Sequence, residues 1–117
     1  MNSQEVGTKL ISLYNEGKVE QIYQELYSNE IVSVEADGTE DVGIDSIAKK
    51  NEKWEAKFEI HSSAATGPFP HADQFIVRFD KDTTHRPSGK RSSKEECGLY
   101  TVKEGKVVRE EFFYAED

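Results

Sequence analysis

The sequence predicts an α+β fold in which a curved antiparallel sheet wraps around three N-terminal helices. Apolar residues recur at helical spacing over most of the first 58 residues and then alternate with a period of two. The alternating segments follow one another as hairpins, without the intervening helices that a parallel sheet requires. A length of 117 residues suffices for one core, so we expect a single domain over residues 1–117.

Two helices open the chain. Val6 and Leu10 lie on the apolar face of a first helix, for which Ser3 is the expected N-cap and Gly17 the C-terminal stop. The same apolar spacing returns from residue 18 to about 27, so a second helix follows after a tight break. The two helices therefore form a short hairpin.

A third helix is expected to begin near residues 45–46. Its common face carries Ile47, Asn51, Trp54 and Phe58 at positions i, i+4, i+7 and i+11. Trp54 is explained by core packing as readily as by ligand contact, because buried aromatic rings contribute strongly to cores. Asn51 needs a hydrogen-bond partner on such a face, from the protein, a ligand or an ordered water.

A short strand separates the second and third helices. Residues 30–36 have strand composition and lead into the turn-rich segment 36–43. Glu35 follows the apolar run that ends at Val34. This carboxylate fits either a solvated strand end or an acid at the mouth of a pocket, and glutamate is seldom fully buried.

Four antiparallel strands complete the predicted fold. They are expected over residues 59–66, 75–80, 91–102 and 107–116, joined by the loops "GPFPHAD" and "THRPSGKR" and the turn "KEGK". A sheet that curls around three short helices makes a cone, and an incompletely filled cone is a pocket.

The composition argues against several classes of partner. With 15 Lys and Arg against 23 Asp and Glu, the net charge is −8, which disfavours nucleic acid and anionic membranes. Cys97 is the only cysteine, so no intrachain disulfide forms, and without short Cys/His ligand spacing we expect neither a metal nor a cofactor. Without a signal peptide or an apolar stretch of about 18 residues, we expect a cytoplasmic protein that does not enter the membrane.

The order of elements and several sequence phrases carry a family resemblance. "LYSNEIVSVEADG" after the helical hairpin and the closing "YTVKEGKVVREEFFY" resemble the SnoaL-like polyketide cyclase group of the nuclear transport factor 2-like superfamily. "GPFPHADQFIVRF" is similar to small bacterial members without an assigned function. The resemblance implies an α+β cone, a cavity between sheet and helices, and a homodimer through the outer face of the sheet. It implies little about chemistry, because the superfamily includes isomerases, cyclases, dehydratases and members with no known reaction.

The ketosteroid isomerases of this superfamily allow a comparison of individual positions. The resemblance places Glu35 at the position of their catalytic aspartate base. Their oxyanion donors have no counterpart, because the tyrosine position falls at Leu10 and the protonated-aspartate position near Gly98. An enolate would lack its main electrostatic stabilisation, so steroid isomerase activity is not expected.

The last strand supplies a second acidic candidate. Four of its residues point one way, and by the resemblance this is the cavity side: Val108, Glu110, Phe112 and Tyr114. Glu110 would then form an acid–base pair with Glu35. A slip of one residue reverses this assignment, turning Glu111 inward and making Glu110 a cross-strand charge partner.

The neighbouring strands add two further candidates, Glu96 and His61. One of Glu95 and Glu96 points inward, and the alternation favours Glu96, which leaves Cys97 facing away as a small apolar residue. His61 starts the strand after the third helix and is expected to face the cavity, whereas His71 is expected to hydrogen-bond within its loop.

The outer face of the predicted sheet is suited to self-association. Ile76, Arg78, Arg109 and Phe113 gather there, and a mixed apolar and charged sheet face is typical of an interface. This observation agrees with the homodimer that the resemblance implies.

Two hypotheses about function follow. The first is a binding site for an unknown small apolar molecule, with proton-transfer chemistry of the isomerase, cyclase or lyase type. Its candidate catalytic residues are Glu35 and Glu110, and its ligand-binding candidates are Asn51, Trp54, Phe58, His61, Phe75, Glu96, Phe112 and Tyr114. The alternative is a non-catalytic ligand-binding or dimeric scaffold module, which the missing oxyanion donors favour.

Overall fold

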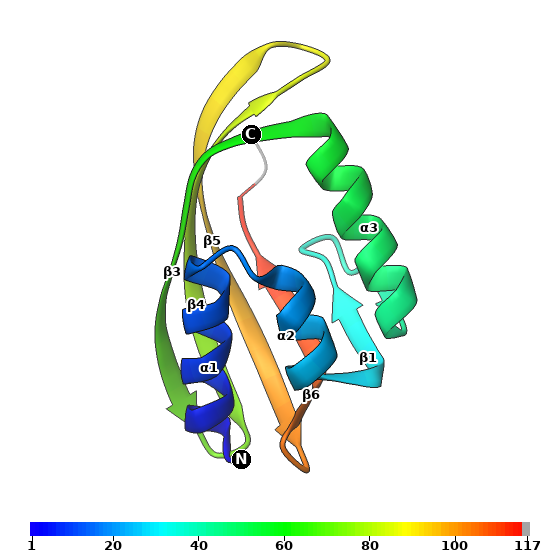
Figure 1. Ribbon diagram of the computed structural model, residues 1–117, viewed down its shortest axis with the longest axis vertical. Coiled ribbons are helices and arrows are strands. Elements are labelled where there is room, and N and C mark those ends of the chain that lie inside the picture. The colour runs from blue at the N-terminus through cyan, green and yellow to red at the C-terminus, as the bar shows by residue number, and fades with distance from the viewer. Residues whose placement is uncertain (116–117) are drawn as a thin grey trace.

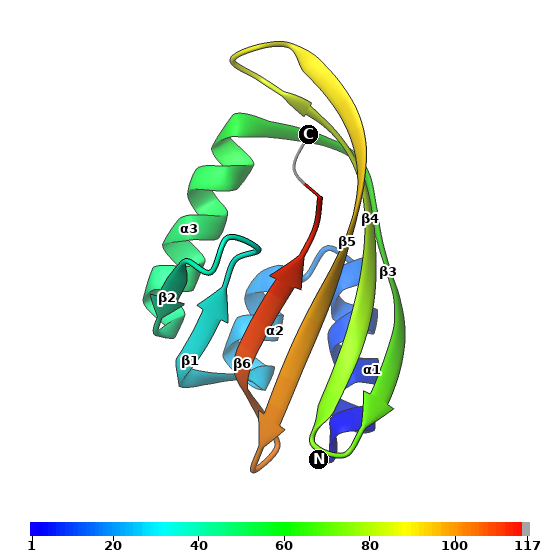
Figure 2. The same cartoon turned by 180° about the vertical axis from the view of Figure 1, so that it is seen from behind.

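Three helices cover one face of a six-stranded sheet in the computed structural model, which describes residues 1–115 (Figure 1). The helices are α1 (Ser3–Asn15), α2 (Val19–Leu26) and α3 (Ile44–Lys57). The strands, in the spatial order β2-β1-β6-β5-β4-β3, are β1 (Tyr27–Val34), β2 (Glu40–Val42), β3 (Phe58–His71), β4 (Gln74–His85), β5 (Lys90–Lys103) and β6 (Lys106–Phe113). The helices lie on what we call the inner face, and no helix of residues 1–115 covers the opposite, outer face (Figure 2). This arrangement confirms the predicted α+β cone. The last residue predicted for the final strand, 116, lies outside the described residues.

The N-terminal cap of α1 differs from the prediction by one residue. The side chain of Asn2, rather than that of Ser3, accepts a hydrogen bond from the Glu5 backbone N–H at 2.9 Å. The Glu5 carboxylate accepts one in return from the Asn2 N–H at 3.1 Å, which completes a capping box. Ser3 is the first helical residue, and its hydroxyl donates to the Ala72 carbonyl at 2.8 Å. Gly17 follows the helix with φ 76°, a conformation that favours glycine, as expected for a stop.

Strand β3 is longer than predicted because its prolines lie at the edge of the sheet. Most of the segment predicted as the loop "GPFPHAD" is strand, with Phe69 paired to Ile76 and Pro70 to Phe75. An edge strand tolerates proline, since one side of its backbone has no neighbouring strand to accept a hydrogen bond. The chain reverses only at residues 72–73.

Strand β1, from the first third of the chain, pairs with the last strand, β6. It runs parallel to β6, with Ser33 opposite Glu110, and antiparallel to β2, a short strand that the turn-rich composition of residues 36–43 concealed. Parallel strands bring their carboxyl ends to the same edge of a sheet. Glu35 and Tyr114, which follow β1 and β6, are therefore neighbours.

A bulge in β6 decides which of its side chains face the helices. Its pairing with β5 shifts by one residue between Val107 and Arg109, so Val108 is the extra residue. Val107 is fully buried, and Glu110 is 3% exposed. The predicted inward orientation is thus correct for Glu110 but wrong for Val108, whose place Val107 takes.

The core lies between the helices and the inner face of the sheet. Its fully buried side chains include Val6, Leu10, Leu26, Ile31, Phe75, Val77 and Val107. Helix α1 approaches the sheet most closely at Gly7, where a Cβ atom would lie 2.7 Å from the Cβ of Pro68. Phe75, a predicted ligand contact, stacks on Tyr100 with ring centroids 4.9 Å apart and is part of this core. Within residues 1–115, no helix is both long and apolar enough to span a membrane.

Candidate functional site

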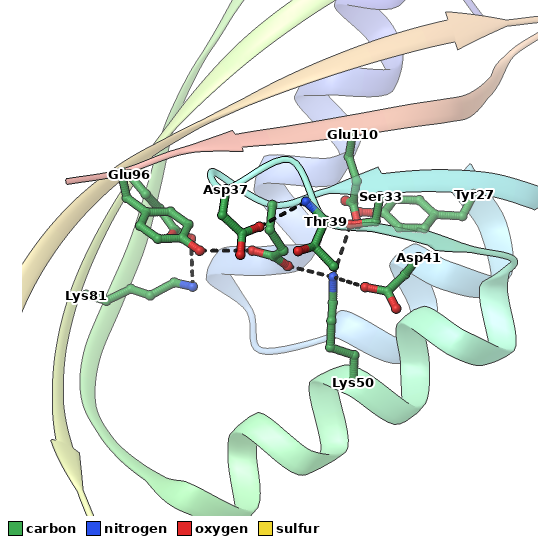
Figure 3. A network of polar contacts seen from close by, with 11 residues as sticks. Tyr27, Ser33, Asp37, Thr39, Asp41, Lys50, Lys81, Glu96 and Glu110 are labelled. Atoms are coloured by element: carbon green, nitrogen blue, oxygen red, sulfur yellow. Dashed lines mark hydrogen bonds and ion pairs between the residues drawn. The ribbon is translucent and has the colours of Figure 1, made fainter. Parts of the chain in front are cut away.

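Lys50 stands at the centre of a polar cluster on the inner face (Figure 3). Its ammonium lies 2.6 Å from Glu35 Oε1, 3.3 Å from Asp41 Oδ2 and 3.3 Å from Ser33 Oγ. An ammonium group has three donors, so each can serve one of these partners. Burial alone lowers the pKa of Lys50, but the hydrogen bonds and charges of Glu35 and Asp41 outweigh burial and raise that pKa. Lys50 therefore remains a cation that ties α3 to β1 and β2.

Glu110 is the buried carboxyl group of this cluster. The Tyr27 hydroxyl donates to Glu110 Oε2 at 2.5 Å, and the fully buried Ser33 hydroxyl is a polar neighbour of the same carboxyl group. Burial raises the pKa of Glu110, and the hydroxyl groups of Tyr27 and Ser33 and the charge of Lys50 oppose this rise without cancelling it. Glu110 therefore holds its proton to a higher pH than a solvated glutamate does.

Glu35 is the more accessible of the two predicted catalytic carboxylates. Its side chain is 27% exposed, and its two oxygens have different partners. Oε1 pairs with Lys50, and Oε2 accepts a hydrogen bond from the Tyr114 hydroxyl at 3.2 Å. Glu35 is thus fixed in a cluster rather than free in solvent. Lys50 hydrogen-bonds both Glu35 and Ser33, and Ser33 is in turn a polar neighbour of Glu110.

A second group of charged and aromatic side chains lies on the inner face. Lys81 forms an ion pair with Glu96 at 3.0 Å, and its ammonium lies 5.1 Å from the centroid of the Trp54 ring. Trp54 stacks on Phe58, with ring centroids 4.8 Å apart. Glu96 pairs in register with the buried Phe79, which confirms that Glu96 rather than Glu95 points inward.

Two of the predicted ligand contacts already have partners within the protein. The Asn51 amide donates to Glu55 Oε1, 3.2 Å away on the same helix. Phe112 is half-buried and packs edge-on against Tyr100, with ring centroids 6.3 Å apart. These contacts tie Asn51 to its own helix and Phe112 to Tyr100 of β5.

The prediction that His61 faces the cavity is wrong. Its imidazole is exposed, and Nε2 lies 2.7 Å from the Thr84 hydroxyl. Thr84 follows the buried Thr83 in β4, so the Thr84 side chain points to the outer face. The register of β3 shifts between Ile60 and Ser62, and this bulge reverses the alternation that the sequence indicated.

Two hollows in the surface of the described residues do not coincide with the predicted cavity. One, of about 500 Å³, lies across β3, β4 and β5 around residues 62–64, and another, of about 420 Å³, lies beside the N-terminus. Neither is lined by Glu35 or Glu110. Tyr27 and Tyr100, both more than nine-tenths buried, fill the deep part of the inner face. A ligand on the inner face would therefore contact the half-buried side chains at the edge of that face.

Four residues of the cluster were not identified from the sequence: Lys50, Asp41, Tyr27 and Ser33. Lys50 lies three residues after Ile47 on α3, on the apolar stripe itself, which could have indicated an inward orientation. Tyr27 and Ser33 are separated by an even number of positions in β1, so the period of a strand places them on one face. Within residues 1–115, no three His, Cys, Asp or Glu side chains are grouped so that they could hold a metal ion.

The sequence matches the family model of the SnoaL-like domain over residues 1–114. The chain belongs to the SnoaL-like family. A candidate SnoaL-like polyketide cyclase from Mesorhizobium loti, also named a carbohydrate phosphatase, is 31% identical to this SnoaL-like chain. The match covers 94% of this chain and 97% of that one, with a TM-score of 0.89.

More distant solved structures share the SnoaL-like fold. A candidate SnoaL-like polyketide cyclase from Jannaschia sp. CCS1 is 15% identical over 95% of this chain and 85% of that one, with a TM-score of 0.80. A protein from Catenulispora acidiphila with a ketosteroid isomerase-like fold, solved in complex with trimethylamine, is 13% identical over 97% and 88% of the two chains, with a TM-score of 0.76. No curated protein matches the sequence. These comparisons confirm the predicted family and its cone-shaped fold.

Proposed function

We propose that this SnoaL-like protein binds a small organic molecule on its inner face and catalyses a proton transfer on it. The observation that carries the proposal is the polar cluster in which Lys50 hydrogen-bonds both Glu35 and Ser33, and Ser33 is a polar neighbour of the buried Glu110. It links a partly exposed carboxylate to a buried carboxyl group of raised pKa, and such contrasting environments are typical of acid–base sites. The similarity to candidate polyketide cyclases, and the trimethylamine complex of a protein with this fold, support a small-molecule ligand.

Glu35 is the proton acceptor in this proposal. Lys50 and Tyr114 each hold one carboxylate oxygen, and each oxygen keeps a second lone pair for a ligand proton. Lys50 compensates the negative charge and fixes the orientation of the carboxylate. Glu110, whose pKa is raised by burial, is the second titratable group, and Ser33 and Lys50 lie between it and Glu35. The half-buried ring of Trp54 would provide an apolar wall.

Hydrogen exchange of a ketone tests this proposal. The protein is incubated in D2O with a panel of cyclic ketones, and the loss of α-proton signals is followed by NMR; lactones and epoxides are tested for ring opening. We expect exchange above the buffer rate, a loss of about 100-fold or more in Glu35→Gln, and no change in Glu52→Gln, which removes an exposed carboxylate of α3. Exchange that survives Glu35→Gln at full rate would exclude Glu35 as the base.

A non-catalytic dimeric module is the second candidate, and exposed apolar side chains on the outer face favour it. Ile76 is 42% exposed and pairs in register with Phe69, which is 57% exposed. Phe113, at the end of β6, is 55% exposed and pairs with Cys97, itself opposite Arg78. These residues form an apolar patch that no helix of the described chain covers, as expected for the homodimer interface.

The two proposed functions are compatible with the same fold, and different experiments distinguish them. A dimer in sedimentation without any ketone exchange or ligand binding would favour the module. Cytoplasmic location, the lack of a nucleic-acid partner and a single domain over residues 1–117 stay predictions from the sequence.

A further inference from the structure

We propose that the inner face carries a binding site for an organic ammonium group, and that the side chain of Lys81 occupies this site in the free protein. The inference rests on the proposed small-molecule function and names the class of ligand that one part of the inner face takes. It concerns the aromatic and acidic group around Lys81 rather than the cluster around Lys50.

The Lys81 ammonium has the surroundings that recognise a bound cation. It lies 5.1 Å from the centroid of the Trp54 ring and 5.7 Å from that of Phe79, and both distances fall within the roughly 6 Å range of cation–π contacts. A carboxylate oxygen of Glu96 lies 3.0 Å away and supplies the opposite charge. Two aromatic rings and one carboxylate, from α3, β4 and β5, thus converge on one positive group. Quaternary ammonium ligands are recognised by aromatic surroundings of this kind.

The aromatic part of the site is held in place by its neighbours. Trp54 stacks on Phe58 with an interplanar angle of 14°. Phe79 is 3% exposed and meets the edge of Tyr14, with ring centroids 5.0 Å apart. The Tyr14 hydroxyl is in turn hydrogen-bonded to Ser63 of β3. The rings therefore keep their positions whether or not the ammonium of Lys81 is present.

Lys81 is the member of this group that can leave. Its side chain is 25% exposed, and its flexible four-carbon stem allows the ammonium to turn into solvent. Glu96 is 21% exposed and would keep an ionic partner if a ligand cation replaced Lys81. Lys81 and Lys50 point into the same region between α3 and the sheet, so a ligand anchored near Glu96 would lie beside the polar cluster (Figure 3). The acidic net charge of −8 also favours a cationic ligand.

Choline and its neutral isostere 3,3-dimethylbutan-1-ol test the inference, because they differ in the charge of one group. Trp54 is the only tryptophan, so its fluorescence reports directly on the site. Lys81→Ala removes the internal occupant, and we expect it to bind choline at least tenfold more tightly than wild type does. It should also prefer choline to the alcohol by at least tenfold. Lys53→Ala, at an exposed position of α3, is the control and should bind choline as wild type does.

Two further variants make the test decisive. Lys81→Gln removes the charge and shortens the side chain, and it takes the place of Lys81→Ala if that variant does not fold, as judged by circular dichroism. Glu96→Gln combined with Lys81→Ala should abolish the preference for choline over the alcohol. Equal binding of choline and the alcohol by the Lys81 variants, or no binding of either, overturns the ammonium site. The proton-transfer proposal is judged separately by ketone exchange in Glu35→Gln and would survive that result.

Discussion

Replacing Glu110 by glutamine puts an amide, which does not titrate, in the place of a carboxyl group of nearly the same shape. Below about pH 4.5, the ordinary pKa, the carboxyl group carries its proton in both the folded and the unfolded chain. Between that pH and the raised pKa of the folded state, the folded protein keeps the proton and the unfolded chain releases it. The free energy of unfolding of the wild type should therefore fall by about 1.4 kcal/mol per pH unit in this window through Glu110 alone. The free energy of unfolding of Glu110→Gln does not fall in this way. The free energy of unfolding of the variant minus that of the wild type should therefore rise with pH.

Urea unfolding measured by Trp54 fluorescence, from about pH 4 to about pH 8, gives this difference directly. Glu52→Gln, at an exposed position of α3, controls for the removal of one negative charge. A difference between Glu110→Gln and wild type that stays flat over this range would mean that Glu110 is not perturbed. A difference that falls with pH would mean that Tyr27 and Ser33 stabilise the ionised carboxylate more than burial destabilises it, and our account of the cluster would have the wrong sign.

Three further substitutions test the fold and the outer face. Asn2→Ala removes the capping box and should lower the free energy of unfolding by about 1 kcal/mol in urea unfolding, with an unchanged value arguing against the cap. Gly7→Ala places a methyl group against the rigid ring of Pro68, so the protein should be destabilised by about 1–3 kcal/mol; a stabilised variant would show that α1 can move away. Phe113→Glu should give a monomer in sedimentation with a change in stability within about 0.5 kcal/mol, whereas Ser93→Glu, at an exposed position of β5, should not alter the oligomeric state.

The fold could be predicted because its signals are local. Helical spacing, the glycine stop at Gly17 and the alternation after residue 58 each depend on a few neighbouring residues. The bulges at His61 and Val108 could not be predicted in the same way, because a bulge is defined by the pairing with another strand. Each bulge reversed an orientation: His61 turned outward, and Val107 took the inward place of Val108.

The candidate site was predicted in part for a related reason. The inward orientation of Glu96 followed from alternation, whereas that of Glu110 also needed the family resemblance, which drew attention to Glu35 as well. The role of Lys50 depends on how α3 packs against β1 and β2, which no local pattern records. A lysine on a helix is usually solvated, and its position on the apolar stripe indicates at most an inward orientation without identifying its three acceptors. Lys81 of β4 was missed because its contacts with Trp54 and Glu96 depend on how α3 and β5 lie against this strand.

The parallel pairing of β1 with β6 has a consequence for the order in which the molecule is made. The hydrogen bond between Tyr27 and Glu110 spans 83 positions, so a ribosome must release most of the polypeptide before the two can meet. Until then β1 emerges with one edge unpaired, a condition that invites association with other nascent chains. The polar cluster is consequently among the last parts of the molecule to be completed during translation, although its first members are synthesised early.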